Sequence, residues 1–181
     1  MSLSTFSQFC KREKSPIFFD IHSLPLGIDP QGKRYLRCPA NWQEWIKYVD
    51  VLQMNKAEAS CLMKKDKVRQ DELINFGRQI VNNNLKICHI TLGSKGSLLF
   101  YYNQGQVVNV HIPPYPIQKV VDVTGSGDAF LSGFLIHYLK HENPVTAANY
   151  ANFVAGMKCT IKGTEMLYQL KSVFNQTNEM G

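Results

Sequence analysis

Apolar residues along this chain alternate between short continuous runs and helical repeats. The continuous runs are rich in β-branched and aromatic residues, as in strands that are covered on both faces of a parallel sheet. The stretches between them place apolar residues on one side at helical spacing. The predicted elements are strands at 17–21, 51–54, 87–92, 97–102 and 106–112, and helices at 42–48, 56–64, 70–82, 126–140 and 145–162, with a weaker helix near the C-terminus.

Turn-forming residues divide these elements and set their order. Residues 22–40 contain three prolines and two glycines and are predicted to form a long loop. Asn103-Gln104-Gly105 predicts the turn of an antiparallel hairpin. Strands that alternate with helices indicate an α/β fold of three layers with a mainly parallel sheet. Ligands of such folds bind beyond the carboxyl ends of the strands.

Composition narrows the class of protein. The 181 residues, 44% of them hydrophobic, predict a single domain over residues 1–181. No apolar run approaches the length that crosses a bilayer, so we expect no membrane segment. Five cysteines without metal-binding spacing predict a reducing cytoplasm. The net charge of +6 comes from scattered lysines and arginines, which argues against nucleic acid and fits a pocket for a small phosphate compound.

The strongest local motif is Asp122-Val123-Thr124-Gly125-Ser126-Gly127-Asp128-Ala129-Phe130, which opens directly into an apolar helix. Gly125 and Gly127 allow a tight turn that points successive N–H groups at one spot, and the helix N-terminus adds positive partial charge there. Asp128 could accept the proton of an attacking hydroxyl beside that anion site. Alternatively, Asp128 is only a favourable first-turn acid.

Two weaker motifs each follow a predicted strand. Thr91-Leu92-Gly93-Ser94-Lys95-Gly96 could bring backbone close to a phosphate or ribose, or could be a plain β-turn. Asn55-Lys56-Ala57-Glu58 is how many helices begin, with a residue that caps the helix and an acid three residues later. Beside a phosphate site the same pair offers oxygens for hydrated magnesium.

Other candidate residues favour structural roles. His137 and His141 share one face of a helix as a possible metal pair, but no third ligand is evident in the sequence. Cys88 and Cys159 fall on apolar elements and are read as inert core thiols.

Together the three motifs resemble those of the PfkB carbohydrate kinase family, the ribokinase-like kinases. DVTGSGDAF resembles the family's DTxGxGDxF signature, with Ser126 where alanine is more usual. NKAE is similar to the NxxE magnesium motif, and TLGSKG to the nucleotide loop. Residues 151–163 resemble the helix beside the adenine, and the resemblance spans about residues 17–175 in the family's order.

The resemblance implies ATP-dependent phosphorylation of a hydroxyl on a sugar or nucleoside-like molecule. Asp128 would be the base, and the amides of Gly125, Ser126 and Gly127 would stabilise the transferring phosphoryl group. The remaining implied roles fall into three sets. Asn55 and Glu58 would hold hydrated Mg²⁺. The nucleotide would be bound by Asn55, Thr91, Gly93, Lys95, Gly96 and Asn152. Asp122 and Thr124 would shape a loop for a monovalent cation such as K⁺, which is found in some members.

The chain also departs from the family's pattern. Members begin with a further N-terminal half, which carries substrate-binding residues and a lid, and neither precedes Phe6 in this sequence. The strand at 17–21 would therefore be an exposed edge, and we expect a partner chain or a second copy to cover it. The alternative function is a noncatalytic nucleotide-binding or interaction module. A substitution of Asn for Asp128 would separate the two.

Overall fold

The computed structural model describes residues 2–12, 15–22, 24–164 and 167–170. The chain divides into two compact units, unit 1 from Met1 to His111 and unit 2 from Ile112 onward. The assignment of residues 1–181 to one domain stays a prediction.

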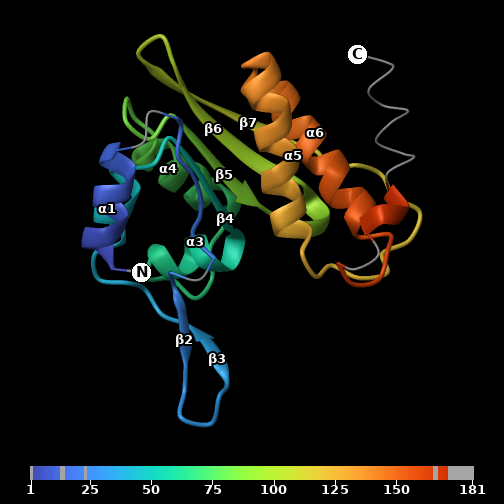
Figure 1. The fold of residues 1–181 in the computed structure, drawn as a ribbon, viewed down its shortest axis with the longest axis horizontal. Helices are drawn as coiled ribbons and strands as arrows, with labels where there is room; N and C mark the ends of the chain where they lie inside the picture. Colours follow the sequence, from blue (N-terminus) through green and yellow to red (C-terminus); the bar gives the residue numbers. More distant parts are fainter. Residues whose placement is uncertain (1, 13–14, 23, 165–166, 171–181) are drawn as a thin grey trace. The chain divides into compact units, whose positions relative to one another are not determined.

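A five-stranded mixed sheet forms the centre of unit 1 (Figure 1). Its strands lie in the order β1-β4-β5-β6-β7, with β1 and β4 parallel, β4 and β5 parallel, and β5 and β6 antiparallel. The strands are β1 (Phe18–Asp20), β4 (Val51–Asn55), β5 (Ile87–Thr91), β6 (Ser97–Asn103) and β7 (Gln106–Ile112). Four of the five residues of β4 and of β5 are buried, because these central strands are flanked by neighbours on both sides.

Four helices of unit 1 contribute to a core that they share with the sheet. Phe6 contacts the rings of both Phe19 and Trp45, and so ties two helices to the edge strand. Trp42 contacts Phe76 in the same way. The helices are α1 (Leu3–Arg12), α2 (Trp42–Ile46), α3 (Lys56–Leu62) and α4 (Gln70–Ile80).

The prediction of a long loop over residues 22–40 is wrong for its middle part. Strands β2 (Leu26–Ile28) and β3 (Arg34–Leu36) form an antiparallel hairpin that extends away from the rest of unit 1 (Figure 1). The carboxylate of Asp29 fixes the turn by accepting from the N–H groups of Gln31 and Lys33 at 3.0 and 2.8 Å. The proline and glycine content masked this hairpin, because the same residues form loops and tight turns.

Unit 2 is built on two long helices that pack along one another, α5 (Ser126–His141) and α6 (Pro144–Lys158). Phe130 and Phe134 of α5 are buried, as are three alanines of α6. Helix α6 ends at Lys158 rather than at the predicted residue 162, because the chain turns back there and Gly163 donates its N–H to Asp122. A 3₁₀ turn, η2 (Leu167–Leu170), follows; the rest of the weak C-terminal helix falls outside the described residues.

No helix within the described part of the chain is both long enough and apolar enough to cross a membrane.

Candidate active site

The loop before α5 forms a helix N-terminus that faces solvent. Gly125 is the N-cap of α5 and has a φ of +77°, a backbone conformation that glycine adopts without strain. Ser126 donates its N–H to Val123, and Ala129 donates to Gly125. The side chain of Asp128 lies exposed in the first turn of this sixteen-residue helix. An anion at this N-terminus would meet N–H groups and the positive end of the helix dipole, with a carboxylate beside it.

Asp122 holds this loop in place. One oxygen of its carboxylate, Oδ1, accepts from the N–H of Thr124, and the other, Oδ2, accepts from the N–H of Gly163, both at 2.9 Å. These backbone hydrogen bonds lower the pKa of Asp122 to about 2. The carboxylate is therefore ionised at every physiological pH, and it ties the loop before α5 to the turn after α6.

A buried lysine, which the sequence analysis missed, lies beneath the same loop. Lys158 ends α6 with a side chain only 1% exposed, and its Nζ donates to the backbone carbonyl of Asp122 at 3.3 Å. Its position at the end of an apolar helix gave no sequence signal, since lysines are common and favourable at helix C-termini.

In unit 1, Asn55 and Glu58 lie where β4 passes into α3. Asn55 Oδ1 accepts from the N–H of Glu58 at 2.9 Å, and Glu58 Oε2 accepts from the N–H of Asn55 at 2.7 Å. This reciprocal pair is a capping box, so the motif starts a helix as one of its two interpretations predicts. The pair also lies at the carboxyl end of a buried strand, where ligands of this class of fold bind. Burial is the main cause that raises the pKa of Glu58.

Three further polar residues gather at this edge, and sequence reasoning did not assign them to the site. Asp20, at the end of β1, accepts from Gln53 Nε2 at 2.7 Å through Oδ2 and from the N–H of His22 through Oδ1. His22 Nδ1 lies 3.5 Å from Glu58 Oε1. The negative charge of Asp20 also raises the pKa of Glu58. The break that Asp20 makes in an apolar strand was the signal that could have found it.

These oxygens fit a hydrated magnesium better than a directly coordinated one. Among the described residues no group of three or more His, Cys, Asp or Glu side chains could hold a metal ion. Two carboxylates of like charge, one of them buried, nevertheless lie at one strand edge, where a divalent cation with its water shell would relieve their repulsion.

The second glycine motif forms a turn between β5 and β6. Thr91 ends β5 and pairs with both Asn55 of β4 and Ser97 of β6. A 3₁₀ turn, η1 (Gly93–Lys95), follows, and Gly93 and Gly96 both have positive φ angles. The carbonyl of Lys95 lies 2.8 Å from His111 Nε2. The structure thus brings Thr91 beside Asn55 at the carboxyl edge of the sheet.

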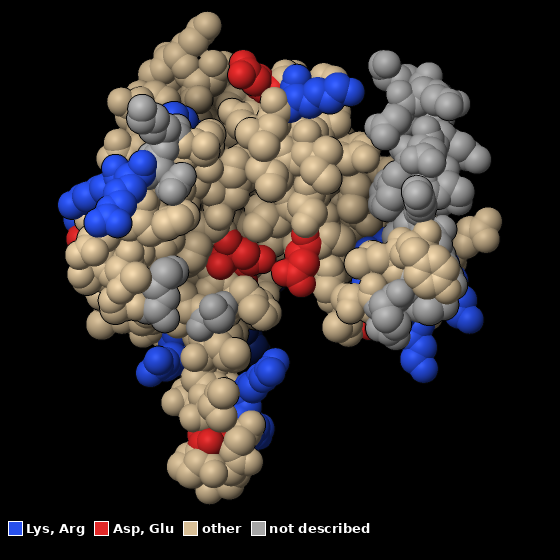
Figure 2. Space-filling view, viewed as in Figure 1, with Lys and Arg blue, Asp and Glu red and all other residues tan. Residues whose placement is uncertain are grey.

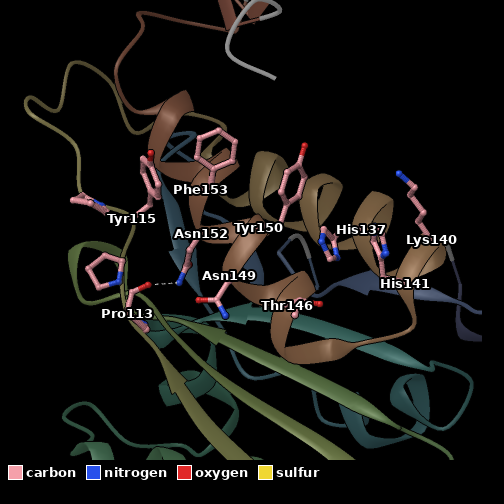
Figure 3. A pocket seen from close by; sticks show the side chains of 12 residues that line it. Pro113, Tyr115, His137, Lys140, His141, Thr146, Asn149, Tyr150, Asn152 and Phe153 are labelled. Atoms are coloured by element: carbon pink, nitrogen blue, oxygen red, sulfur yellow. Dashed lines mark hydrogen bonds between the residues drawn. The ribbon is translucent and has the colours of Figure 1, made fainter. Parts of the chain in front are cut away.

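Asn152 lies at a cavity in unit 2 whose volume is about 590 Å³ (Figure 3). The side-chain amide of Asn152, 8% exposed, donates to the carbonyls of Ile112 and Pro113 and holds the proline-rich segment against α6. Tyr115 and Phe153 meet edge to face at one end of the cavity, with a ring centroid distance of 4.9 Å.

The paired histidines of α5 line the other end of this cavity. The rings of His137 and His141 are 4.4 Å apart, and His137 also contacts Tyr150. Burial is the main cause that lowers the pKa of His137, which favours the neutral ring. Both histidines and Tyr150 thus form part of the wall of this cavity.

The chain is similar to known proteins over most of its length. The family model for pfkB family carbohydrate kinases matches residues 26–168. A deoxyribokinase of Salmonella typhi is 29% identical over 122 residues, which are 67% of this chain and 38% of that protein. A ribokinase of Dictyostelium discoideum is 31% identical over 145 residues, covering 73% of this chain and 45% of the relative. The chain therefore spans less than half the length of these curated relatives.

Solved structures agree in fold. A ribokinase of Arabidopsis thaliana, complexed with ribose and ATP, superposes with a TM-score of 0.70 at 25% identity, over 90% of this chain and 48% of that one. A nucleoside kinase of Burkholderia thailandensis, in complex with inosine, gives a TM-score of 0.64 at 22% identity, over 89% and 46%. These similarities confirm the predicted ribokinase-like α/β fold class. Because the family model matches most of its length, the chain belongs to the PfkB family of carbohydrate kinases.

Proposed function

We propose that this chain carries the catalytic half of an ATP-dependent kinase that phosphorylates a hydroxyl of a sugar or nucleoside-like molecule. The observation that carries the proposal is the position of Asp128, an exposed carboxylate in the first turn of α5 and next to the Gly125–Gly127 turn. A general base beside an anion site is the arrangement that transfer of a phosphoryl group to a hydroxyl needs.

In the proposed reaction the acceptor oxygen bonds to the γ-phosphorus of ATP as the bond to the β-phosphate oxygen breaks. The acceptor proton goes to the carboxylate of Asp128, and ADP leaves. The amides of the Gly125–Gly127 turn would stabilise the charge on the transferring group together with the helix dipole, and Ser126 would exchange its hydrogen bond to the carbonyl of Val123 for one to the phosphoryl oxygen. The ionised Asp122 keeps these donors aligned through Thr124.

Magnesium fits the carboxylate edge of unit 1. When bound, it would neutralise charge on the β- and γ-phosphates. Asn55 and Glu58 would hold its water shell, and the Asp20 carboxylate is a further acceptor within the same cluster. The capping box fixes both side chains before any ligand arrives, which lowers the entropy cost of binding.

Two further places in the fold are proposed to bind the nucleotide: the turn after β5 and the cavity at Asn152. Thr91, Gly93, Lys95 and Gly96 form a turn at the carboxyl edge of β5, beside Asn55. Asn152 borders a cavity with aromatic walls, whose volume suits a nucleobase. We propose that the turn in unit 1 contacts phosphate or ribose and, for unit 2 taken by itself, that the Asn152 cavity receives a nucleobase.

One observation favours a second candidate, a noncatalytic nucleotide-binding module. The chain spans 38% of the deoxyribokinase and 45% of the ribokinase described above, so the similarity does not extend over the whole of those kinases. We also propose that a partner chain or a second copy lies against β1, the terminal strand of the sheet that the described residues form. The phosphate acceptor itself would then be recognised jointly.

The experiment that tests the proposal is calorimetric titration of the purified chain with a nonhydrolysable ATP analogue, with and without Mg²⁺. Saturable binding that tightens with Mg²⁺ is expected, and ATP turnover with a panel of sugars and nucleosides should follow. Binding without turnover on any acceptor would favour the noncatalytic module. No binding at millimolar analogue would overturn the assignment of the nucleotide site.

A further inference from the structure

Lys158 is a cation buried beneath the anion site, and the proposed reaction does not use it. Its side chain is 1% exposed, and its Nζ donates to the carbonyl oxygen of Asp122. Its Cε lies 3.8 Å from the point that a β-carbon on Gly125 would occupy. The Lys158 side chain therefore lies close to the backbone of Gly125, and its charged end lies against the carbonyl of Asp122.

A monovalent cation fits poorly against the oxygens of Asp122. Such an ion needs several oxygens in place of its hydration shell. All three oxygens of Asp122 already accept from protein donors: the two carboxylate oxygens from the N–H groups of Thr124 and Gly163, and the carbonyl from the Lys158 ammonium. A second cation placed against these oxygens would also be repelled by the ammonium at short range in a partly buried site.

We propose that the ammonium of Lys158 is a built-in replacement for the monovalent cation that the resemblance led us to expect at Asp122 and Thr124. An ammonium is close to K⁺ in size and charge and seeks the same oxygens. The side chain therefore supplies the positive charge permanently. The loop keeps its shape, and the site its affinity for phosphate, without K⁺ in solution.

The ammonium has two consequences for the site. It compensates the ionised Asp122, whose negative charge would otherwise oppose an incoming phosphate. It also connects the end of α6 to the loop before α5, so that the anion site is formed before nucleotide binds. The second consequence concerns folding alone. The first rests on the proposed nucleotide-binding function.

The test compares thermal unfolding of the full chain in KCl, NaCl and LiCl at equal ionic strength. The wild type is expected to have the same Tm in all three salts. Lys158→Ala removes the charge and leaves a space, so its Tm should fall by about 5 °C or more in LiCl and recover specifically with KCl. Lys158→Met fills the space without charge, and its Tm should not respond to K⁺.

Lys162→Ala is the matched control, since this lysine is exposed in the turn after α6; its Tm should be unchanged and salt-independent. A K⁺-specific rise in the wild-type Tm overturns the proposal without any variant. A folded Lys158→Ala chain that ignores K⁺ overturns it as well. Because Tm needs no turnover, a chain without kinase activity would overturn the proposed function and leave this result standing. The second measurement is the affinity for an ATP analogue. It should be independent of K⁺ in the wild type, which has Lys158, and should depend on K⁺ in Lys158→Ala.

Discussion

Asn55 and Glu58 cap the same helix reciprocally, each side chain accepting from the other residue's backbone N–H. This relationship places a carboxylate that is 4% exposed at the carboxyl edge of β4, next to the Asp20 cluster. A capping box explains why the helix starts there. It does not explain why a second carboxylate lies so near, and that juxtaposition makes Glu58 sensitive to pH and to cations.

Glu58→Gln should separate the capping role from the charge. The pKa of Glu58 is raised above its ordinary value of 4.5, chiefly by burial. Its contribution to stability is therefore fully present below about pH 4.5 and is lost as pH rises through the raised pKa. Glutamine keeps the capping acceptor and carries no charge. Denaturant unfolding should show the wild type losing stability relative to Glu58→Gln as pH rises from about 4 to 7.

The wild type and Glu58→Gln should also differ in their response to Mg²⁺. At neutral pH, Mg²⁺ should raise the Tm of the wild type and leave that of Glu58→Gln unchanged, because the cation relieves the repulsion between Glu58 and Asp20. Glu44→Gln, at an exposed ion pair with Lys47, is the control and should respond to Mg²⁺ as the wild type does. Equal responses of all three proteins would remove Glu58 from the proposed magnesium site.

Asp128→Asn should abolish phosphotransfer while nucleotide binding persists. Loss of a general base lowers turnover by about a hundredfold to ten-thousandfold. The amides of the anion site are untouched, so the Kd for an ATP analogue should stay within about threefold. Turnover is measured with the best acceptor from the screen, and Asp66→Asn, an exposed acid outside the site, is the control. Undiminished turnover in Asp128→Asn would show that another group takes the proton.

The buried His89 predicts an acid-sensitive core. It is fully buried in β5, and burial lowers its pKa from 6.5 to about 3. The folded chain keeps this ring neutral while the unfolded chain protonates it below about pH 6.5, so stability falls as pH drops toward 3. Between about pH 8 and pH 5 this group accounts for a loss of about 2 kcal/mol.

The measurement is urea unfolding of the wild type and His89→Gln at both pH values. The variant should lose about 2 kcal/mol less than the wild type on acidification. His141→Gln, at an exposed position, should show the wild-type pH dependence. A pH dependence that survives in His89→Gln would assign the acid sensitivity to other groups.

The position of β1 at the end of the sheet predicts association. In the sheet formed by the described residues β1 is the terminal strand, and its residues Phe18 and Phe19 are only half-buried. A terminal parallel strand with large apolar side chains favours pairing with another chain. Light scattering should give a mass well above the 20.6 kDa of one chain, with a dependence on protein concentration. A folded chain that stays at 20.6 kDa at every concentration would refute this expectation.

Local patterns predicted most of the fold. Continuous apolar runs gave the strands β1, β4 and β5, because burial on both faces leaves no place for polar residues. The glycine pair before an apolar helix placed the N-terminus of α5 correctly, since only a tight turn with a positive φ at Gly125 fits there. The hairpin at 26–36 was missed because the same prolines and glycines serve loops and turns alike.

The sequence by itself thus determined the class of fold and the family, and it placed Asp128 in the first turn of α5, because these depend on spacing within short segments. The tertiary structure decided the rest. It brought Asp20 beside Gln53, thirty-three residues away, because β1 and β4 pair in register. It also buried Lys158 under Asp122, because α6 packs along α5 and returns the chain to the loop. Neither relationship has a local signal, since each arises from contacts between segments distant in sequence.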